Sequence, residues 1–129
     1  MAKTFMQMVK EAMAQVQGIS ADEAQQRLKQ DSNTLFVDVR DDADIPSTGL
    51  APGGVNISLG MLPVRADLEL PREFRDSRLK DRSRQIILAC QLGSNSARGA
   101  KLLKDMGFTN VAYLEGGMKA WKAAGFPTE

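Results

Sequence analysis

The chain has 129 residues, a length that suits one domain built around a single hydrophobic core. Its 17 Lys and Arg side chains nearly balance its 16 Asp and Glu side chains. The resulting net charge of +1 gives no overall field that favours nucleic acid or an anionic membrane surface. Histidine is absent, which excludes Cys-His pairs, Ser-His-Asp triads and imidazole metal sites.

Cysteine usage and apolar runs set expectations for the compartment. The one cysteine cannot form an internal disulfide. Polar residues interrupt the N-terminal segment before an apolar core like that of a signal peptide develops. We therefore expect a cytoplasmic protein. No run approaches the roughly 20 apolar residues that a membrane-spanning helix needs, so we expect it to be soluble, with no membrane contact.

Residues 4–17 form the first predicted element, an amphipathic helix that Gly18 ends. Its apolar side chains recur at helical spacing: Phe5, Met8, Val9, Ala12, Met13 and Val16. This stripe either packs on its own domain or forms a homodimer or partner contact through adaptable methionines, and we favour the first reading. We assign residues 1–18 to this helix and residues 19–129 to the domain.

Helix and strand signals then alternate along the chain. Ser20 begins a capping box for a helix to residue 30, and the apolar run 34–39 predicts a central strand. A loop at 41–54 precedes a weak strand at 55–57, and two short helices are expected within 61–80. The remaining elements are a strand at 85–89, a helix at 96–106 that ends at Gly107, a strand at 111–114, a turn at Gly116-Gly117 and a helix at 118–124. This alternation predicts an α/β fold with a mainly parallel sheet.

Cys90 stands where the strand 85–89 ends, which is where ligands gather in open α/β sheets. The loop after it is rich in small residues: Gln91, Leu92, Gly93, Ser94, Asn95 and Ser96. Its backbone N–H groups and the next helix start are placed to stabilise a thiolate. The alternative is that Cys90 is a small buried hydrophobe, since free cysteines are among the most buried residues. The residues alone leave both readings open.

Four ordered segments resemble the rhodanese family of single-domain sulfurtransferases. They are Leu35-Phe-Val-Asp-Val-Arg40, Gly53-Gly-Val-Asn-Ile57, the Cys90 segment 86–96, and Leu114-Glu-Gly-Gly117 with Trp121. The resemblance covers residues 20–127 and implies a three-layer α/β/α domain. It also implies that Cys90 takes a sulfane sulfur from a donor such as thiosulfate and passes it to a thiol or cyanide, as a thiosulfate sulfurtransferase does. The N–H groups of residues 91–96 would then bind the anionic persulfide, with no metal or organic cofactor.

Three charged residues are candidates for supporting roles. Asp38 and Arg40 match the family's Asp-Val-Arg and are expected to form a structural ion pair that ties a loop. Arg98 either steers an anionic donor or is an ordinary surface arginine. Trp121 is expected to anchor the last helix in the core.

The hydroxyl groups of Ser94 and Ser96 either bind the persulfide or cap the helix, and capping is favoured for Ser96. Two departures from the family pattern bear on the donor. The family's Gly-His-Ile segment reads Gly49-Leu-Ala51 here, and Asn95 stands where its loop often carries arginine.

Two other function classes remain as alternatives. Dual-specificity phosphatases share the fold and carry Cys-x5-Arg, but the corresponding position here is Ser96, and Arg98 comes two residues later. This reading is the least favoured. A non-catalytic sulfur carrier or protein-interaction module, contacting a partner through the N-terminal helix, is the stronger alternative.

Overall fold

The protein is built on a five-stranded sheet, and a computed structural model describes all 129 residues. The strands are β1 (Gln17–Ile19), β2 (Leu35–Asp38), β3 (Val55–Asn56), β4 (Ile86–Ala89) and β5 (Val111–Leu114). Their order is β1-β5-β4-β2-β3, and every neighbouring pair is parallel.

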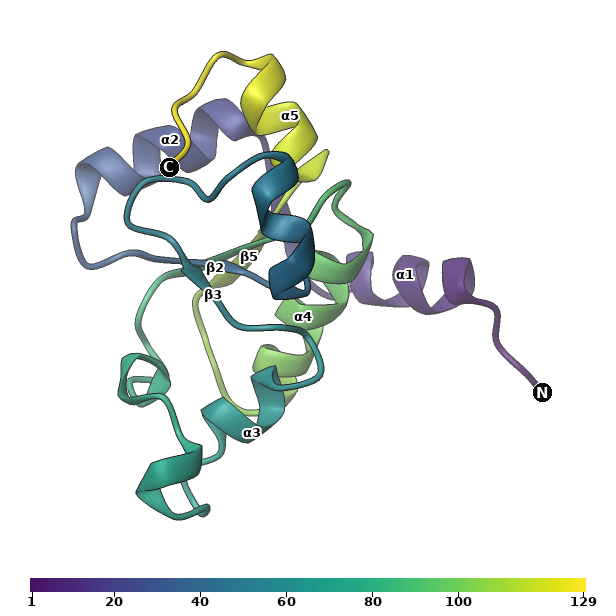
Figure 1. Cartoon of the computed structure of the whole chain (residues 1–129). Coiled ribbons are helices and arrows are strands. Elements are labelled where there is room, and N and C mark those ends of the chain that lie inside the picture. The colour runs from purple at the N-terminus through teal and green to yellow at the C-terminus, as the bar shows by residue number, and fades with distance from the viewer.

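Helices cover both faces of this sheet (Figure 1). They are α1 (Phe5–Met13), α2 (Ala21–Gln30), α3 (Leu62–Ala66), α4 (Ser94–Asp105) and α5 (Gly117–Ala123), with short 3-10 turns η1 (Asp42–Ser47), η2 (Arg72–Phe74) and η3 (Ser77–Leu79). Helices α2 and α5 lie over one face and α3 and α4 over the other. The predicted three-layer α/β/α architecture is confirmed. None of the helices is long and apolar enough to span a membrane.

Alternating side chains of β4 divide the core in two. Ile86 and Leu88 belong to the cluster that packs against α3 and α4, whereas Ile87 and Ala89 belong to the cluster under α2 and α5. All four are fully buried, as expected of a parallel strand covered on both faces. Cys90 continues the series of Ile86 and Leu88, so its side chain lies on the α4 face.

Trp121 anchors α5 in the second cluster, as predicted. Its ring is fully buried and lies 5.6 Å from the Phe36 ring and 5.1 Å from the Phe126 ring, measured between centroids. The indole N–H donates to the carbonyl oxygen of Pro127 at 2.9 Å, which satisfies its polar atom. This contact also holds the C-terminal segment against α5.

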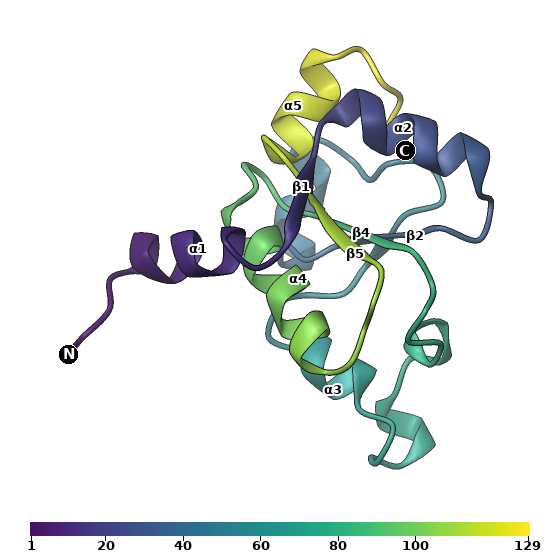
Figure 2. The same cartoon turned by 180° about the vertical axis from the view of Figure 1, so that it is seen from behind.

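The N-terminal segment differs from the prediction. The helix begins after the Thr4 cap but ends at Met13, and Gly18 lies inside the edge strand β1, beside β5 (Figure 2). The prediction places the end of the helix too late because Val16 continues the apolar pattern. Val16 does pack on the core, but it lies in the turn after α1. The boundary expected at residue 18 therefore falls within β1.

Helix α1 packs on α4 through part of its stripe only. Val9 and Ala12 are buried, whereas Phe5, Met8 and Met13 are exposed. The favoured reading, that the stripe packs on its own domain, therefore holds for its central residues.

Several other boundaries also shift. The N-cap of α2 is Ser20, whose Oγ accepts from the N–H of Glu23 at 3.1 Å. This is one half of the predicted capping box. The predicted loop at 41–54 contains η1, and the region 61–80 folds as α3, η2 and η3 rather than as two helices. Pro63 lies in the first turn of α3 and Pro71 at the cap of η2, where the missing N–H costs no helical hydrogen bond.

Candidate active site

Backbone amides surround the sulfur of Cys90. The N–H of Gly93 donates to Cys90 Sγ at 3.0 Å and the N–H of Ser96 donates at 3.3 Å. The Ser96 hydroxyl oxygen lies 3.5 Å from Sγ. Cys90 is 5% exposed, so it is buried as the alternative reading expected. However, its sulfur accepts from two backbone N–H groups, so it does not lie among apolar atoms alone.

The first turn of α4 supplies part of this cradle. The helix begins at Ser94, two residues before the predicted start, because Gly93 is its N-cap with a φ of 110° that side chains disfavour. Residues 90–93 alone connect β4 to α4. The Ser96 N–H belongs to the first turn of α4 and is one of the free amides of a helix N-terminus. The helix dipole adds to the stabilisation of negative charge there.

The prediction that Ser96 caps α4 is wrong. The cap residue is Gly93, which has no side chain, and Ser96 lies within the helix. The Ser96 hydroxyl donates to the Gly93 carbonyl oxygen at 3.0 Å. It therefore ties the first turn of α4 to the connecting segment.

Helix α5 holds the backbone of Cys90 from the other side. The N–H of Met118 donates to the Cys90 carbonyl at 2.8 Å, and the N–H of Lys119 donates to the Gln91 carbonyl at 3.2 Å. A Cβ on Gly117 would lie 2.5 Å from the Cys90 carbonyl oxygen and would also clash with that of Gln91. Glycine at this position therefore allows α5 to approach the cysteine segment.

Asp38 and Arg40 form the expected ion pair beside this segment. Arg40 Nη2 lies 2.7 Å from Asp38 Oδ2, and Nε donates to Oδ1 at 2.9 Å, with 4% and 0% of the two side chains exposed. Arg40 also donates to Gln91 Oε1 at 3.0 Å and to the carbonyls of Asp44 and Gly49. The pair therefore ties the loop after β2 to the residue next to Cys90.

A cavity of about 500 Å³ opens at Cys90. Among the predicted binding residues, Gln91, Leu92, Ser94 and Asn95 line it, whereas Gly93 and Ser96 contact the sulfur itself. The remaining lining residues come from other parts of the chain: Phe5, Val39, Arg40, Asp41, Asp44, Ser47 and Leu59. The structure thus brings the predicted cysteine segment together at one cavity.

Sequence comparison connects this geometry to known proteins. The family model for the Rhodanese-like domain matches residues 20–124. The chain belongs to this family. A sulfurtransferase from Allochromatium vinosum is 28% identical over 112 residues, which cover 87% of this chain and 94% of that protein.

Two solved structures resemble the fold of this rhodanese-like chain over most of its length. A Rhodopseudomonas palustris protein of unknown function, called a possible tyrosine phosphatase, has a TM-score of 0.91 and 29% identity, covering 100% of this chain and 96% of that one. The polysulfide-sulfur transferase homodimer from Wolinella succinogenes has a TM-score of 0.73 and 26% identity, covering 94% of this chain and 83% of that one.

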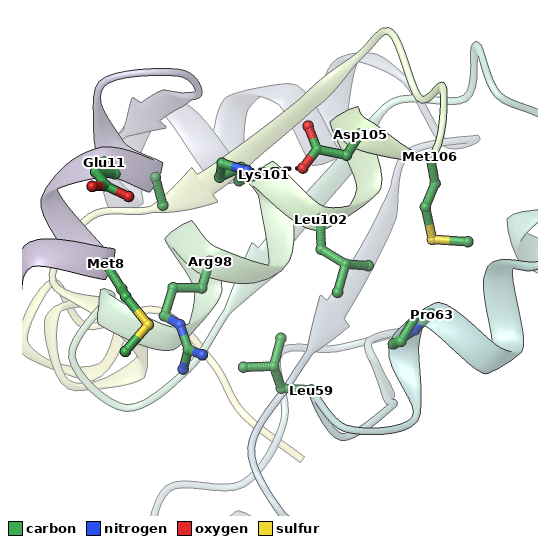
Figure 3. Close-up of a pocket in the computed structure, with 10 residues that line it drawn as sticks. Met8, Glu11, Leu59, Pro63, Arg98, Lys101, Leu102, Asp105 and Met106 are labelled. Carbon is green, nitrogen blue, oxygen red and sulfur yellow. Dashed lines mark hydrogen bonds and ion pairs between the residues drawn. The ribbon is translucent and has the colours of Figure 1, made fainter. Parts of the chain in front are cut away.

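Arg98 lies beside the cavity of this rhodanese-like domain without lining it. Arg98 lines a neighbouring hollow between α1 and α4, where Figure 3 shows it next to Met8 and Leu59. Its guanidinium lies 5.6 Å from the centre of the Phe5 ring and donates to Asn95 Oδ1 at 3.1 Å. Arg98 is thus held at the protein surface beside the cavity and does not line it.

Sequence reasoning missed Phe5, Asp41, Asp44 and Leu59 at the cavity. Each comes from a different element or loop from Cys90, and only tertiary packing brings them to its sulfur. The one signal available for the two aspartates was their place directly after β2. Parallel β2 and β4 end at the same edge of the sheet, so the segments after these two strands meet there.

Proposed function

We propose that the protein is a sulfurtransferase that carries a sulfane sulfur on Cys90. The observation that supports this most directly is the pair of amides, from Gly93 and Ser96, that donate to Cys90 Sγ at 3.0 and 3.3 Å. Donors fixed around a sulfur lower the free energy of its anionic form and require no reorganisation during reaction. Membership of the rhodanese-like family and the likeness to the Allochromatium sulfurtransferase support transferase chemistry.

The first half-reaction loads the cysteine. The Cys90 thiolate attacks the outer sulfur of a donor such as thiosulfate, and a new S–S bond forms. The donor's own S–S bond breaks, and sulfite leaves with the bonding electron pair. The amides at the start of α4 then stabilise the negative charge on the persulfide, in the manner of an oxyanion hole.

The second half-reaction removes the sulfur from Cys90. An external thiolate or cyanide attacks the outer sulfur, and Cys90 leaves as the thiolate, ready for another donor. The acceptor has to come from outside because the chain has no second cysteine to resolve the persulfide. A thiol acceptor suits the reducing cytoplasm, the compartment that the cysteine usage favours.

Phosphatase chemistry has less support from the site. The position six residues after Cys90 is Ser96, and Arg98 lines the neighbouring hollow. The only arginine that lines the cavity, Arg40, is paired with Asp38 and hydrogen-bonded to Gln91. No guanidinium that lines the cavity is therefore free to bind a phosphate group bidentately.

Turnover tests the proposal. Thiocyanate release from thiosulfate and cyanide is measured for the wild type and for Cys90→Ser, with hydrolysis of an aryl phosphate measured in parallel. The proposal expects thiocyanate release that depends on Cys90. Sulfur loading without turnover would favour the carrier, and neither loading nor turnover would favour an interaction module. Phosphate release that is lost in Cys90→Ser would overturn the sulfurtransferase reading.

A further inference from the structure

The Cys90 cavity carries an excess of negative charge. Asp41 and Asp44 line it, both are exposed, and neither takes part in an ion pair or a side-chain hydrogen bond. Arg40 is the only cationic side chain that lines the cavity, and Asp38 neutralises it at 2.7 Å. Two unpaired carboxylates therefore set the charge that an approaching molecule meets.

The neighbouring hollow offsets only part of this charge. It shares Leu59 with the Cys90 cavity, and one of its cations is unpaired. Arg98 and Lys101 are the cations and Glu11 and Asp105 the anions, as Figure 3 shows. Lys101 is paired with Asp105 and Glu11 with Lys3, both at 2.8 Å, so Arg98 is the one unpaired charge in the hollow. One positive charge beside the cavity, against two unpaired carboxylates on its lining, leaves the net charge there negative.

Besides the uncharged polar residues Ser47, Gln91, Ser94 and Asn95, the cavity is lined by apolar side chains. Phe5 and Leu92 stand at its edge with 46% and 62% of their surfaces exposed, and Val39 and Leu59 lie deeper. A volume of about 500 Å³ suits a small molecule, because small-molecule sites commonly occupy about 300–1,000 Å³. The cavity thus combines apolar walls with negative charge at Asp41 and Asp44.

We propose that Asp41 and Asp44 are specificity-determining residues that select a small thiol with an uncharged or cationic body as the sulfur acceptor. This inference rests on the proposed sulfurtransferase function. The persulfide takes a proton from water to give Cys90–S–SH. The acceptor thiolate attacks its outer sulfur and forms the S–S bond of its own persulfide, R–S–SH. The bond to Cys90 breaks, Cys90 leaves as the thiolate with the electron pair, and the proton stays on the transferred sulfur. Carboxylates on the acceptor would meet like charges, and an ammonium group would meet opposite ones.

The transfer from the Cys90 persulfide to the acceptor is measured by itself when the protein is loaded with sulfur beforehand. Cys90 is loaded with excess thiosulfate, the donor is removed, and the rate of persulfide loss is followed in a single turnover. The acceptors are cysteamine, which is cationic, and mercaptosuccinate, which carries two carboxylates, each normalised to uncharged 2-mercaptoethanol. Loading is done at high salt, which screens Asp41 and Asp44 from the dianionic thiosulfate, so if no persulfide forms there, the proposed function fails. If it forms, the charge proposal is tested separately.

Charge-neutralising variants identify the residues responsible. At low salt, Asp41→Asn and Asp44→Asn should each raise the normalised rate for mercaptosuccinate by about two- to fivefold and lower that for cysteamine by a similar factor. The matched control is Asp22→Asn, an exposed site at the start of α2 over the other face of the sheet, which should leave both ratios unchanged. Comparing each variant with the wild type for the same thiol cancels that thiol's own reactivity.

Salt provides an independent readout. In the wild type, added salt should raise the mercaptosuccinate rate and lower the cysteamine rate, and the effect should shrink in the double variant. A wild type that favours mercaptosuccinate, or variants that behave like Asp22→Asn, would overturn the inference while leaving the sulfurtransferase proposal intact.

Discussion

Replacing Gly117 with alanine tests whether α5 holds the cysteine segment in place. Gly117 has a φ of 64°, a region that costs a residue with a Cβ about 1 kcal/mol. The added Cβ would also lie 2.5 Å from the Cys90 carbonyl oxygen, which is backbone and has no rotamer to relieve the clash. The segment or the start of α5 has to move.

The expected cost comes from the contacts that this movement breaks. The Met118 and Lys119 amides donate to the Cys90 and Gln91 carbonyls at 2.8 and 3.2 Å, and each such hydrogen bond contributes about 1 kcal/mol. The loss of these two hydrogen bonds, added to the backbone strain, means that Gly117→Ala should lower the free energy of unfolding by about 3 kcal/mol. Because the Cys90 backbone shifts, sulfur loading should also slow by about tenfold or more.

Gly125→Ala is the matched control. Gly125 has a φ of 83°, but no atom lies within 4 Å of the position of its Cβ, so only the strain of about 1 kcal/mol applies. Urea unfolding of both variants measures the difference, and loading of Cys90 from thiosulfate measures its effect on the site. Equal destabilisation by the two substitutions, with normal loading in Gly117→Ala, would refute the reasoning.

Three further predictions concern the ion pairs and the sulfur cradle. Arg40→Met should cost about 3–5 kcal/mol because it leaves the buried Asp38 carboxylate without its charged partner, and the double variant with Asp38→Leu should be more stable than the single one in urea unfolding. Ser96→Ala should slow loading by less than about tenfold, since its backbone N–H still donates to the sulfur, and a complete loss of loading would show that the hydroxyl is essential. Hydrogen bonds from Arg78 hold the pKa of Asp76 below its ordinary value. The stabilisation from this ion pair is therefore present at neutral pH and is lost as pH falls below about 4. The urea midpoints of the wild type and Arg78→Gln should converge at that pH, and a difference between them that stays constant with pH would contradict this.

The sheet and the place of the cysteine were predictable because their signals are local. Strands β2, β4 and β5 are apolar runs, and the structure finds each of them within one or two residues of its predicted bounds. Cys90 comes directly after β4, and the carboxyl ends of parallel strands share one edge of the sheet. Chain order alone therefore predicted the position of the sulfur.

The missed features depend on contacts between distant segments. Strand β1 has only the residues Gln17–Ile19, which form a strand because β5 lies beside them, and no propensity marks so short an element. The start of α4 at Ser94 depends on the left-handed conformation of Gly93, which the sequence permits but does not require. Asp41 and Asp44 reach the cavity only after β2 and β4 pair.

The mass of the peptide that contains Cys90, measured after the protein is incubated with thiosulfate, tests the central claim most directly. The account predicts a gain of one sulfur on that peptide, reversed by cyanide and absent from Cys90→Ser. A peptide that keeps its unmodified mass while the protein still releases thiocyanate would contradict the account, because sulfur would then move without the thiol that the Gly93 and Ser96 amides surround.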